Sequence, residues 1–215
     1  MQLFEGESPR PELILRTARK RGRLNETVFD GVRPVVASIM LRTPILGQIL
    51  SLIGAVKASP GAMDTALREG KSLSLAPGGI GEMFLDPKAG KEFALIKGRK
   101  GFVRRAMAHG VPLVPVFVFG NSETFKRAPL PAVLESASRF LKASLVLFWG
   151  RWGLPIPFKV PLTFAIGEAL HVERNASPTP EQVDALHSRF CEELTGVFDR
   201  FKVDYGWGDK QLELR

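Results

Sequence analysis

The chain has 215 residues, a formal net charge of +8 and one cysteine. Its length suits one domain with a substantial core, and 45% apolar with 24% charged residues excludes a disordered chain. The single Cys191 excludes an internal disulfide and favours a reducing compartment, and we expect it to be a small buried residue on a helix, not a nucleophile.

Positive charge favours acidic partners, such as nucleic acid, an anionic lipid surface or a polyphosphorylated small molecule. Two segments concentrate it, and either alone is typical of a solvated face. The first holds Arg10, Arg16, Arg19, Lys20, Arg21, Arg23 and Arg33; the second holds Lys97, Arg99, Lys100, Arg104 and Arg105. Met1–Pro11 contains acids and no apolar core, so no secretory signal is predicted. The apolar stretch Pro34–Val56 is interrupted by Arg42-Thr43-Pro44, so no transmembrane helix is predicted either.

Short apolar runs alternate with helical patterns from about Arg33 onward. Leu113–Phe119 is apolar and largely β-branched or aromatic, which is typical of a strand buried on both faces. Gly110 is expected to end the helix before it. The predicted elements are, in chain order, the strand Val35–Ile39, the helix Ile45–Leu52, the short strand Ala55–Ala58, the helix Gly61–Glu69, the strand Ser72–Ala76, the helix Lys100–His109, and the strands Leu113–Phe119 and Leu162–Ile166.

The last predicted helix begins with a capping box, in which Thr179 precedes Pro180 and Gln182. One apolar stripe then follows at three- and four-residue spacing: Val183, Leu186, Phe190, Leu194, Val197 and Phe201. Strands that alternate with helices predict a single α/β domain with a mixed or largely parallel central sheet flanked by helices. We expect Ser72–Ala76 and Leu113–Phe119 to lie in that sheet.

A glycine-rich turn, Pro77-Gly78-Gly79-Ile80-Gly81-Glu82, directly follows one predicted strand. Ligands of α/β sheets bind beyond the carboxyl ends of strands, and glycines let backbone approach a ligand closely. Glu82 is the only acid of the turn. The turn has neither the Gly-Lys-Ser/Thr of a P-loop nor the spacing of a dinucleotide fingerprint. The alternative is a tight turn with a solvated glutamate.

A basic turn, Lys97-Gly98-Arg99-Lys100-Gly101-Phe102, leads into a predicted helix. Cations beside the backbone donors of a helix N-terminus are a natural place for phosphate, although a solvated basic turn is the alternative. We expect the two turns to converge on one pocket. The candidate substrate-binding residues are Pro77, Gly78, Gly79, Glu82, Arg99, Lys100, Gly101 and Phe102.

Other routes to catalysis lack their motifs. The chain has no Gly-x-Ser-x-Gly, no His-Glu-x-x-His and no Cys/His cluster, so no metal site is predicted. The three histidines have ordinary structural interpretations. His109 falls at a helix end, His171 lies in a charged loop, and His187 flanks the stripe of the last helix.

Several ordered blocks resemble the diacylglycerol acyltransferase 2 / monoacylglycerol acyltransferase family. The similarity covers about residues 29 to 206, with residues 1–28 left as a basic arm and 207–215 as a C-terminal tail. Ala169 stands where the family usually has proline. The blocks are Phe29-Asp30-Gly31-Val32-Arg33-Pro34, Pro77 to Glu82, Arg99-Lys100-Gly101-Phe102 with Ala106, His109-Gly110, Leu113-Val114-Pro115 and Phe119-Gly120, then Pro161-Leu162-Thr163 with Gly167-Glu168, and finally Pro178, Asp184, Leu186-His187, Phe198-Asp199, Lys202 and Tyr205-Gly206.

The resemblance implies a glycerolipid-acyltransferase α/β fold and transfer of a fatty acyl group from acyl-CoA to mono- or diacylglycerol, as in triacylglycerol synthesis. Acyl-CoA is then a substrate and no cofactor is needed. It also implies the cytosolic face of the endoplasmic reticulum or a lipid droplet. We expect Trp149-Gly150-Arg151-Trp152 and the basic arm to meet the membrane surface.

The family's His-Pro-His-Gly motif is missing, since no histidine precedes His109. Three explanations compete: a truncated sequence, an inactive paralogue, or an unrecognised base, for which His109 is a weak candidate. We expect little or no transfer by the chain as written. The alternative function is a non-catalytic lipid- or acyl-CoA-binding homologue that modulates an active relative. A nucleic-acid-binding module rests on charge alone and has no recognisable reader motif.

Overall fold

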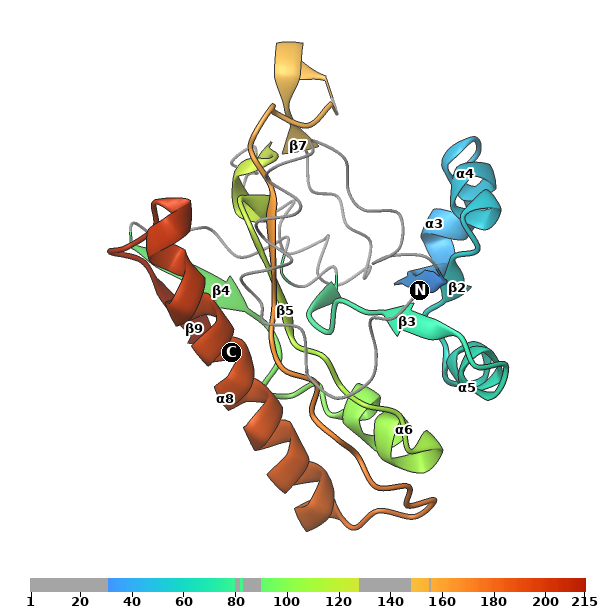
Figure 1. Cartoon of the computed structure of the whole chain (residues 1–215). Coiled ribbons are helices and arrows are strands. Elements are labelled where there is room, and N and C mark those ends of the chain that lie inside the picture. The colour runs from blue at the N-terminus through green and yellow to red at the C-terminus, as the bar shows by residue number, and fades with distance from the viewer. Residues whose placement is uncertain (1–30, 80–81, 83–89, 128–147, 155) are drawn as a thin grey trace, which may run out of the picture. The chain divides into compact units, whose positions relative to one another are not determined.

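The computed structural model of the chain describes residues 31–79, 82, 90–127, 148–154 and 156–215 (Figure 1). The chain divides into two compact units. Of the described residues, the first comprises 31–77, 100–113 and 169–187, and the second comprises 78–79, 82, 90–99, 114–127, 148–154, 156–168 and 188–215. The predicted basic arm, residues 1–28, lies outside the described residues.

The first unit contains a three-stranded parallel sheet in the order β2-β1-β3. Val32 of β1 lies opposite Ser72 of β3, and Val35 lies opposite Val56 of β2. Helix α5 begins at Pro60, which suits a first helical turn, and contacts β2 and β3. In chain order the elements are β1 (Val32–Val36), α3 (Ser38–Arg42), α4 (Leu46–Leu52), β2 (Val56–Lys57), α5 (Pro60–Arg68), β3 (Ser72–Ser74) and α6 (Gly101–His109).

The core of the first unit is built from one face of α6 and the beginning of the last helix, α8 (Pro180–Tyr205). Gly110 ends α6 in the left-handed conformation, as the sequence predicts. Three partly buried side chains, Phe102, Val111 and Leu113, pack against this core. Its buried members are Val103, Ala106, Met107, Val172, Val183 and Leu186.

The described part of the second unit contains three two-stranded sheets. The β4–β9 pair is parallel, whereas the β5–β8 and β6–β7 pairs are antiparallel. The elements are β4 (Lys91–Ala94), β5 (Val116–Phe119), a 3-10 turn η2 (Asn121–Glu123), β6 (Lys126–Arg127), β7 (Phe148–Trp149), a 3-10 turn η3 (Arg151–Gly153), β8 (Thr163–Ile166), the remainder of α8, and β9 (Gln211–Leu214). The described part of the chain therefore mixes helices with parallel and antiparallel strands, and its class is α/β.

Aromatic side chains form the core of the second unit. Phe119 and Phe198 are fully buried and stack with ring centroids 5.5 Å apart. Phe117 meets Phe198 edge to face at 5.0 Å, and Trp207 meets Phe119 at 5.5 Å. Buried aromatic pairs in these geometries contribute beyond the area they bury. This cluster fixes the later turns of α8 against β5.

The capping box predicted for α8 is confirmed. The Gln182 N–H donates to Thr179 Oγ1 at 3.3 Å, and the Thr179 N–H donates to Gln182 Oε1 at 3.0 Å. The predicted apolar stripe is buried throughout, from Val183 to Phe201. Because local capping and packing agree, α8 is the element that sequence patterning predicts best.

Three expectations about strands are corrected. The strand predicted over Val35–Ile39 ends at Val36, and Ser38–Arg42 is the helix α3. The strand predicted over Leu113–Phe119 begins at Val116, which is 43% exposed, so it is not buried on both faces. Among the described strands, β3 pairs with β1 and β5 pairs with β8, so the two do not share one sheet.

Two further features concern residues 207–215 and the length of the helices. Gln211–Leu214 form strand β9 along β4, and Trp207 is buried, so these residues are integrated into the second unit.

None of the helices in the described part of the chain has the length and apolar character that a membrane-spanning helix needs.

Candidate functional site

The glycine-rich turn is shaped around the side chain of Glu82. Gly78 is buried, and a Cβ at this position would collide with the Glu82 carboxylate. Gly79 has a φ of +52°, a conformation that glycine adopts at little cost. The turn therefore needs glycine at Gly78 so that Glu82 can fold back over the backbone.

Glu82 reaches strand β4. Its Oε1 atom accepts a hydrogen bond of 2.9 Å from the backbone N–H of Leu95, directly after the strand ends. Burial raises the pKa of the Glu82 carboxyl, and the Leu95 N–H partly opposes that rise. Glu82 is thus half-buried and hydrogen-bonded, which differs from the solvated glutamate considered as the alternative from the sequence. A raised pKa makes this carboxylate a stronger base than an exposed one.

The segment after Leu95 forms a tight basic turn. The Arg99 N–H donates to the Ile96 carbonyl at 2.8 Å. The backbone N–H groups of Ile96 and Lys97 both donate to the carbonyl of Arg215, at 2.7 and 2.8 Å. The side chains of Lys97 and Arg99 are exposed. Hydrogen bonds within the turn and to Arg215 therefore fix its backbone, while the side chains of Lys97 and Arg99 remain exposed. Two exposed cations on a fixed backbone suit a phosphate-bearing ligand.

Residues at the start of α6 have structural partners. Lys100 is the N-cap, and its Nζ lies 2.6 Å from Asp184 Oδ1 on α8. Phe102 packs against the core of the first unit, with its ring 6.1 Å from that of His187. Gly101 is exposed, and no side chain caps the helix N-terminus. Lys100 and Phe102 therefore stabilise α6 whether or not a ligand is bound.

The structure brings some of the predicted site residues together. Gly78, Gly79, Glu82 and Arg99 belong to the second unit, where Glu82 is hydrogen-bonded to the residue four positions before Arg99. Pro77 and the segment 100–102 belong to the first unit. The convergence of both turns on one pocket stays a prediction.

His109 has partners that the sequence did not reveal. Its Nε2 atom lies 3.1 Å from Asp64 Oδ1 on α5, and the same oxygen accepts a hydrogen bond of 2.5 Å from Arg105. The hydrogen bond from Arg105, with a further one from His109, lowers the pKa of Asp64. The four-residue spacing of Arg105 and His109 on one helix face was the available signal. Because both side chains bind one carboxylate, this cluster ties α6 to α5.

The other reactive side chains occupy structural positions. Cys191 is half-buried on α8, and burial raises the pKa of its thiol although Lys97 lies near enough to oppose that rise. His187 is buried beside the core, as its position next to the stripe predicts. Cys191 therefore lies on a helix as expected but is half-buried, not buried as the sequence predicted, and its raised pKa disfavours the thiolate.

Comparison with known proteins gives a consistent result. The diacylglycerol acyltransferase family model matches residues 22–215. Human diacylglycerol O-acyltransferase 2 is 29% identical over 202 residues, which covers 86% of this chain and 52% of the relative. Bovine 2-acylglycerol O-acyltransferase 1 is 34% identical over 179 residues, covering 77% of this chain and 53% of the relative. Bovine diacylglycerol O-acyltransferase 2-like protein 6 is 31% identical over 205 residues, covering 86% and 60%.

The chain thus spans about half the length of the curated relatives it matches first. No solved structure matches it. The family match includes the glycine-rich turn, the basic turn, α6, the β5–β8 pair and α8, which are the elements described above. On this match of nearly its whole length, the chain belongs to the diacylglycerol acyltransferase family.

Proposed function

We propose that this chain serves the transfer of a fatty acyl group from acyl-CoA to the hydroxyl of diacylglycerol or monoacylglycerol. The observation that carries the proposal is the family match over residues 22–215. Two of the relatives named above are, by name, O-acyltransferases of diacylglycerol and of 2-acylglycerol. A fold like that of glycerolipid acyltransferases is part of the same proposal and rests on the same match.

The reaction makes definite demands on the protein. The glycerol hydroxyl oxygen attacks the thioester carbonyl carbon, the carbon–sulfur bond breaks, and the hydroxyl proton is finally carried by the CoA thiol. Lys97 and Arg99 are exposed cations on a fixed backbone and suit the phosphates of CoA. Glu82 is a half-buried carboxyl with a raised pKa and suits the positioning of the acceptor hydroxyl or of a base.

The base itself has no strong candidate among the described side chains. No histidine precedes His109 in the sequence, and His109 shares Asp64 with Arg105. A well-placed base contributes roughly 10²–10⁴-fold in rate. We therefore propose that these 215 residues alone catalyse acyl transfer slowly. A segment that carries His-Pro-His-Gly should restore the rate of transfer.

A grafting experiment tests this proposal. The chain is compared with a version that carries the family's N-terminal His-Pro-His-Gly segment, using radiolabelled acyl-CoA with mono- or diacylglycerol. Both proteins must first sediment as folded, non-aggregated species. Transfer that rises about 10²-fold or more on grafting supports the proposal. Rapid transfer by the ungrafted chain would show that the base lies elsewhere, and His109→Ala is then the first variant to measure.

A second candidate function is a non-catalytic acyl-CoA-binding homologue that modulates an active relative. The structural positions of His109 and His187 favour it, because neither imidazole lies unpaired in an open site. Titration calorimetry with a non-hydrolysable acyl-CoA thioether distinguishes the binding step from turnover. Binding that persists while the grafted protein gives no transfer would favour this candidate.

The same titration tests the basic turn. The double variant Lys97→Ala/Arg99→Ala is expected to weaken binding about tenfold or more, because each charge-assisted contact contributes roughly 1.5–3 kcal/mol. Lys100→Ala is less suitable, since it also breaks the ion pair with Asp184. Arg189→Ala removes an exposed arginine of α8 and is the matched control. Equal binding by the parent and the double variant would show that the basic turn is a solvated surface that does not contact acyl-CoA.

Localisation is proposed on the same basis as activity. We propose the cytosolic face of the endoplasmic reticulum or of a lipid droplet, where the glycerolipid acceptor resides. The support is family membership and the net charge of +8, which suits anionic lipid. A fluorescent fusion of the full chain should co-localise with markers of either membrane, and a uniform cytosolic distribution would contradict the proposal.

A further inference from the structure

Helices α3 and α4, with the Thr43–Ile45 turn between them, expose an apolar surface. Leu52 is 85% exposed and Ile45 is 72% exposed. A cluster of exposed large apolar side chains on one surface element indicates an interaction site. We call this surface the α3–α4 tip, and its exposed apolar members are Ile39, Met40, Ile45, Leu46, Ile49, Leu52 and Ile53.

Two hydroxyl groups of the tip, those of Thr43 and Ser51, are hydrogen-bonded within it. The Ser51 hydroxyl donates to the Gly47 carbonyl at 2.7 Å, and the Thr43 hydroxyl donates to the Ile39 carbonyl at 3.1 Å. Gly47 is buried, and a Cβ there would collide with the Leu41 carbonyl, so α3 and α4 pack closely. Internal hydrogen bonds lower the cost of moving hydroxyl groups out of water. The tip therefore exposes mainly apolar side chains to its surroundings.

The charge of the tip has one sign. From Gly31 to Met63 the sequence contains no acidic residue, and its cations are Arg33, Arg42 and Lys57. The Arg33 guanidinium donates to the Ile53 carbonyl. Arg42 makes no hydrogen bond or ion pair with any residue that the structure describes. A surface of apolar side chains that carries Arg42, a cation paired with no described residue, complements a bilayer with anionic headgroups.

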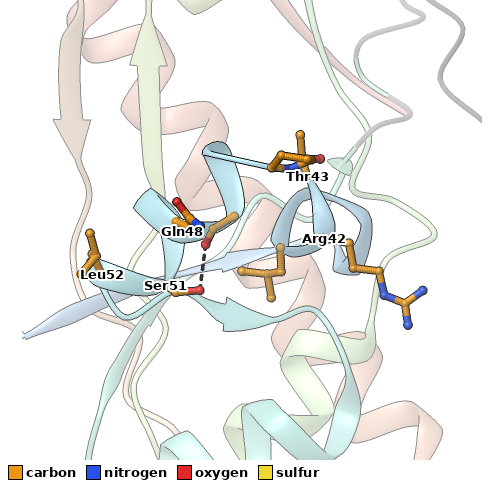
Figure 2. A pocket seen from close by; sticks show the side chains of 8 residues that line it. Arg42, Thr43, Gln48, Ser51 and Leu52 are labelled. Atoms are coloured by element: carbon orange, nitrogen blue, oxygen red, sulfur yellow. Dashed lines mark hydrogen bonds between the residues drawn. The ribbon is translucent and has the colours of Figure 1, made fainter.

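Arg42 borders an open depression on the tip, about 610 Å³ in volume. Figure 2 shows Arg42 at one end of this depression and Leu52 at the other, with Thr43, Gln48 and Ser51 between them. Helices of five and seven residues cannot span a membrane, but they can lie in its interface.

We propose that the α3–α4 tip inserts into the headgroup–acyl boundary of an anionic bilayer, with its apolar side chains among the acyl chains and Arg42 at the level of the lipid phosphates. The inference rests on the proposed function only in that a glycerolipid acceptor resides in a membrane. Vesicle binding is measured without turnover, so failure of one proposal leaves the other standing.

Co-sedimentation of the full chain with vesicles tests the proposal. The vesicles contain phosphatidylcholine and phosphatidylserine, and a second set contains phosphatidylcholine alone. Ile49→Gln/Leu52→Gln keeps helix propensity while removing two exposed apolar side chains. This variant is expected to lower the partition coefficient at least about tenfold, because full burial of one such side chain in hydrocarbon already corresponds to that factor. Arg42→Gln should lower it about fivefold on anionic vesicles and little on neutral ones.

Val203→Gln is the matched control. Val203 is an exposed apolar side chain, at 67%, on helix α8 and outside the tip. Its replacement should leave vesicle binding unchanged, and all three variants should melt like the parent. Equal loss of binding in Val203→Gln and in the double variant would overturn the proposal, as would unchanged binding in the double variant.

Two other outcomes would also overturn it. Trp152 is 76% exposed beside Arg151, whose guanidinium lies 4.5 Å from the indole ring. If Trp152→Ser abolishes vesicle binding while the double variant retains it, the Trp149–Trp152 segment is the membrane contact. If the parent is a dimer in sedimentation equilibrium and the double variant is a monomer with parental vesicle binding, the tip is an interface between two copies of the chain.

Discussion

Helix α8 and the α3–α4 tip are both rich in apolar side chains but place them in opposite environments. From Val183 to Phe201 the stripe of α8 is buried, and Val203 is the only large apolar side chain of this helix that is largely exposed. The tip instead exposes seven large apolar residues. The contrast separates two roles for the same residue types. Apolar residues that the fold already covers contribute to stability, whereas those left in water are available to a partner.

The strongest test of this contrast compares Phe198→Ala with Leu52→Gln. Phe198 is fully buried among Phe117 and Phe119, so its truncation should lower the free energy of unfolding by about 3–5 kcal/mol. Leu52→Gln should change it by no more than about 0.5 kcal/mol, because the side chain is already in water. Denaturant titration followed by circular dichroism measures both. Similar losses of unfolding free energy in the two variants would show that the apolar side chains of the tip contribute to stability as those of α8 do.

The glycine-rich turn extends the contrast to a polar contact. Gly78→Ala places a Cβ against the Glu82 carboxylate and should displace it from the Leu95 N–H. The expected loss of unfolding free energy is roughly 1–3 kcal/mol, because a buried polar group loses its partner. Gly61→Ala in α5 meets no atom and should be neutral or stabilising by up to about 1 kcal/mol. Equal stability of the two variants would mean that Glu82 is not held by the turn.

Two substitutions of Glu82 distinguish its hydrogen bond from its charge. Glu82→Ala leaves the Leu95 N–H without its acceptor and should cost roughly 1–3 kcal/mol. Glu82→Gln keeps an acceptor, and because burial raises the pKa of the native carboxyl, it should be at least as stable as the parent at neutral pH.

The pH dependence supplies the control for Glu82. With a raised native pKa, the folded state binds its proton more tightly than the unfolded state. The stability of the parent should therefore fall as pH rises from the unfolded pKa through the raised native pKa, and Glu82→Gln should lack that fall. If the parent were less stable to unfolding than Glu82→Gln only below pH 4, that result would contradict the assigned burial of Glu82.

The smallest expected effect concerns Asp64. Asp64→Asn should lower the free energy of unfolding by about 1 kcal/mol at neutral pH, because its ion pair with Arg105 and its hydrogen bond with His109 are partly exposed. Since the hydrogen bond from Arg105 lowers the native pKa, this contribution is present above the unfolded pKa and is lost as pH falls through the native pKa. Thermal melts of both proteins between pH 7 and pH 3 should converge at the acidic end. A constant difference would assign the loss to packing.

Sequence patterning predicted elements that local rules specify. The cap and stripe of α8, the stop of α6 at Gly110 and the short helix α5 need only neighbours along the chain. The strand limits were less predictable, because a short apolar run such as 35–41 fits a strand or a helix equally well. In the structure β1 ends at Val36 and the helix α3 begins at Ser38.

The candidate site was predictable only as two turns. Glycines beside a glutamate and cations beside a helix start are visible in the sequence. The hydrogen bond from Leu95 to Glu82 and the support of Lys97 by Arg215 join residues 13 and 118 positions apart, and no local pattern encodes them. The pairing of His109 with Asp64 was missed for the same reason, since the two lie 45 positions apart.

The pairing of β4 with β9 also has a consequence for the order of events during synthesis. Lys91 lies opposite Gln211, so β4 leaves the ribosome 120 residues before its partner strand exists. At roughly 5–20 residues per second, this edge waits about 6–24 s without its ladder of hydrogen bonds. An uncovered strand edge is a template for pairing with another chain. The β4–β9 pairing of the second unit can therefore form only after β9 has been synthesised. Until then, the nascent chain with an unpaired β4 is the species that a chaperone would need to protect.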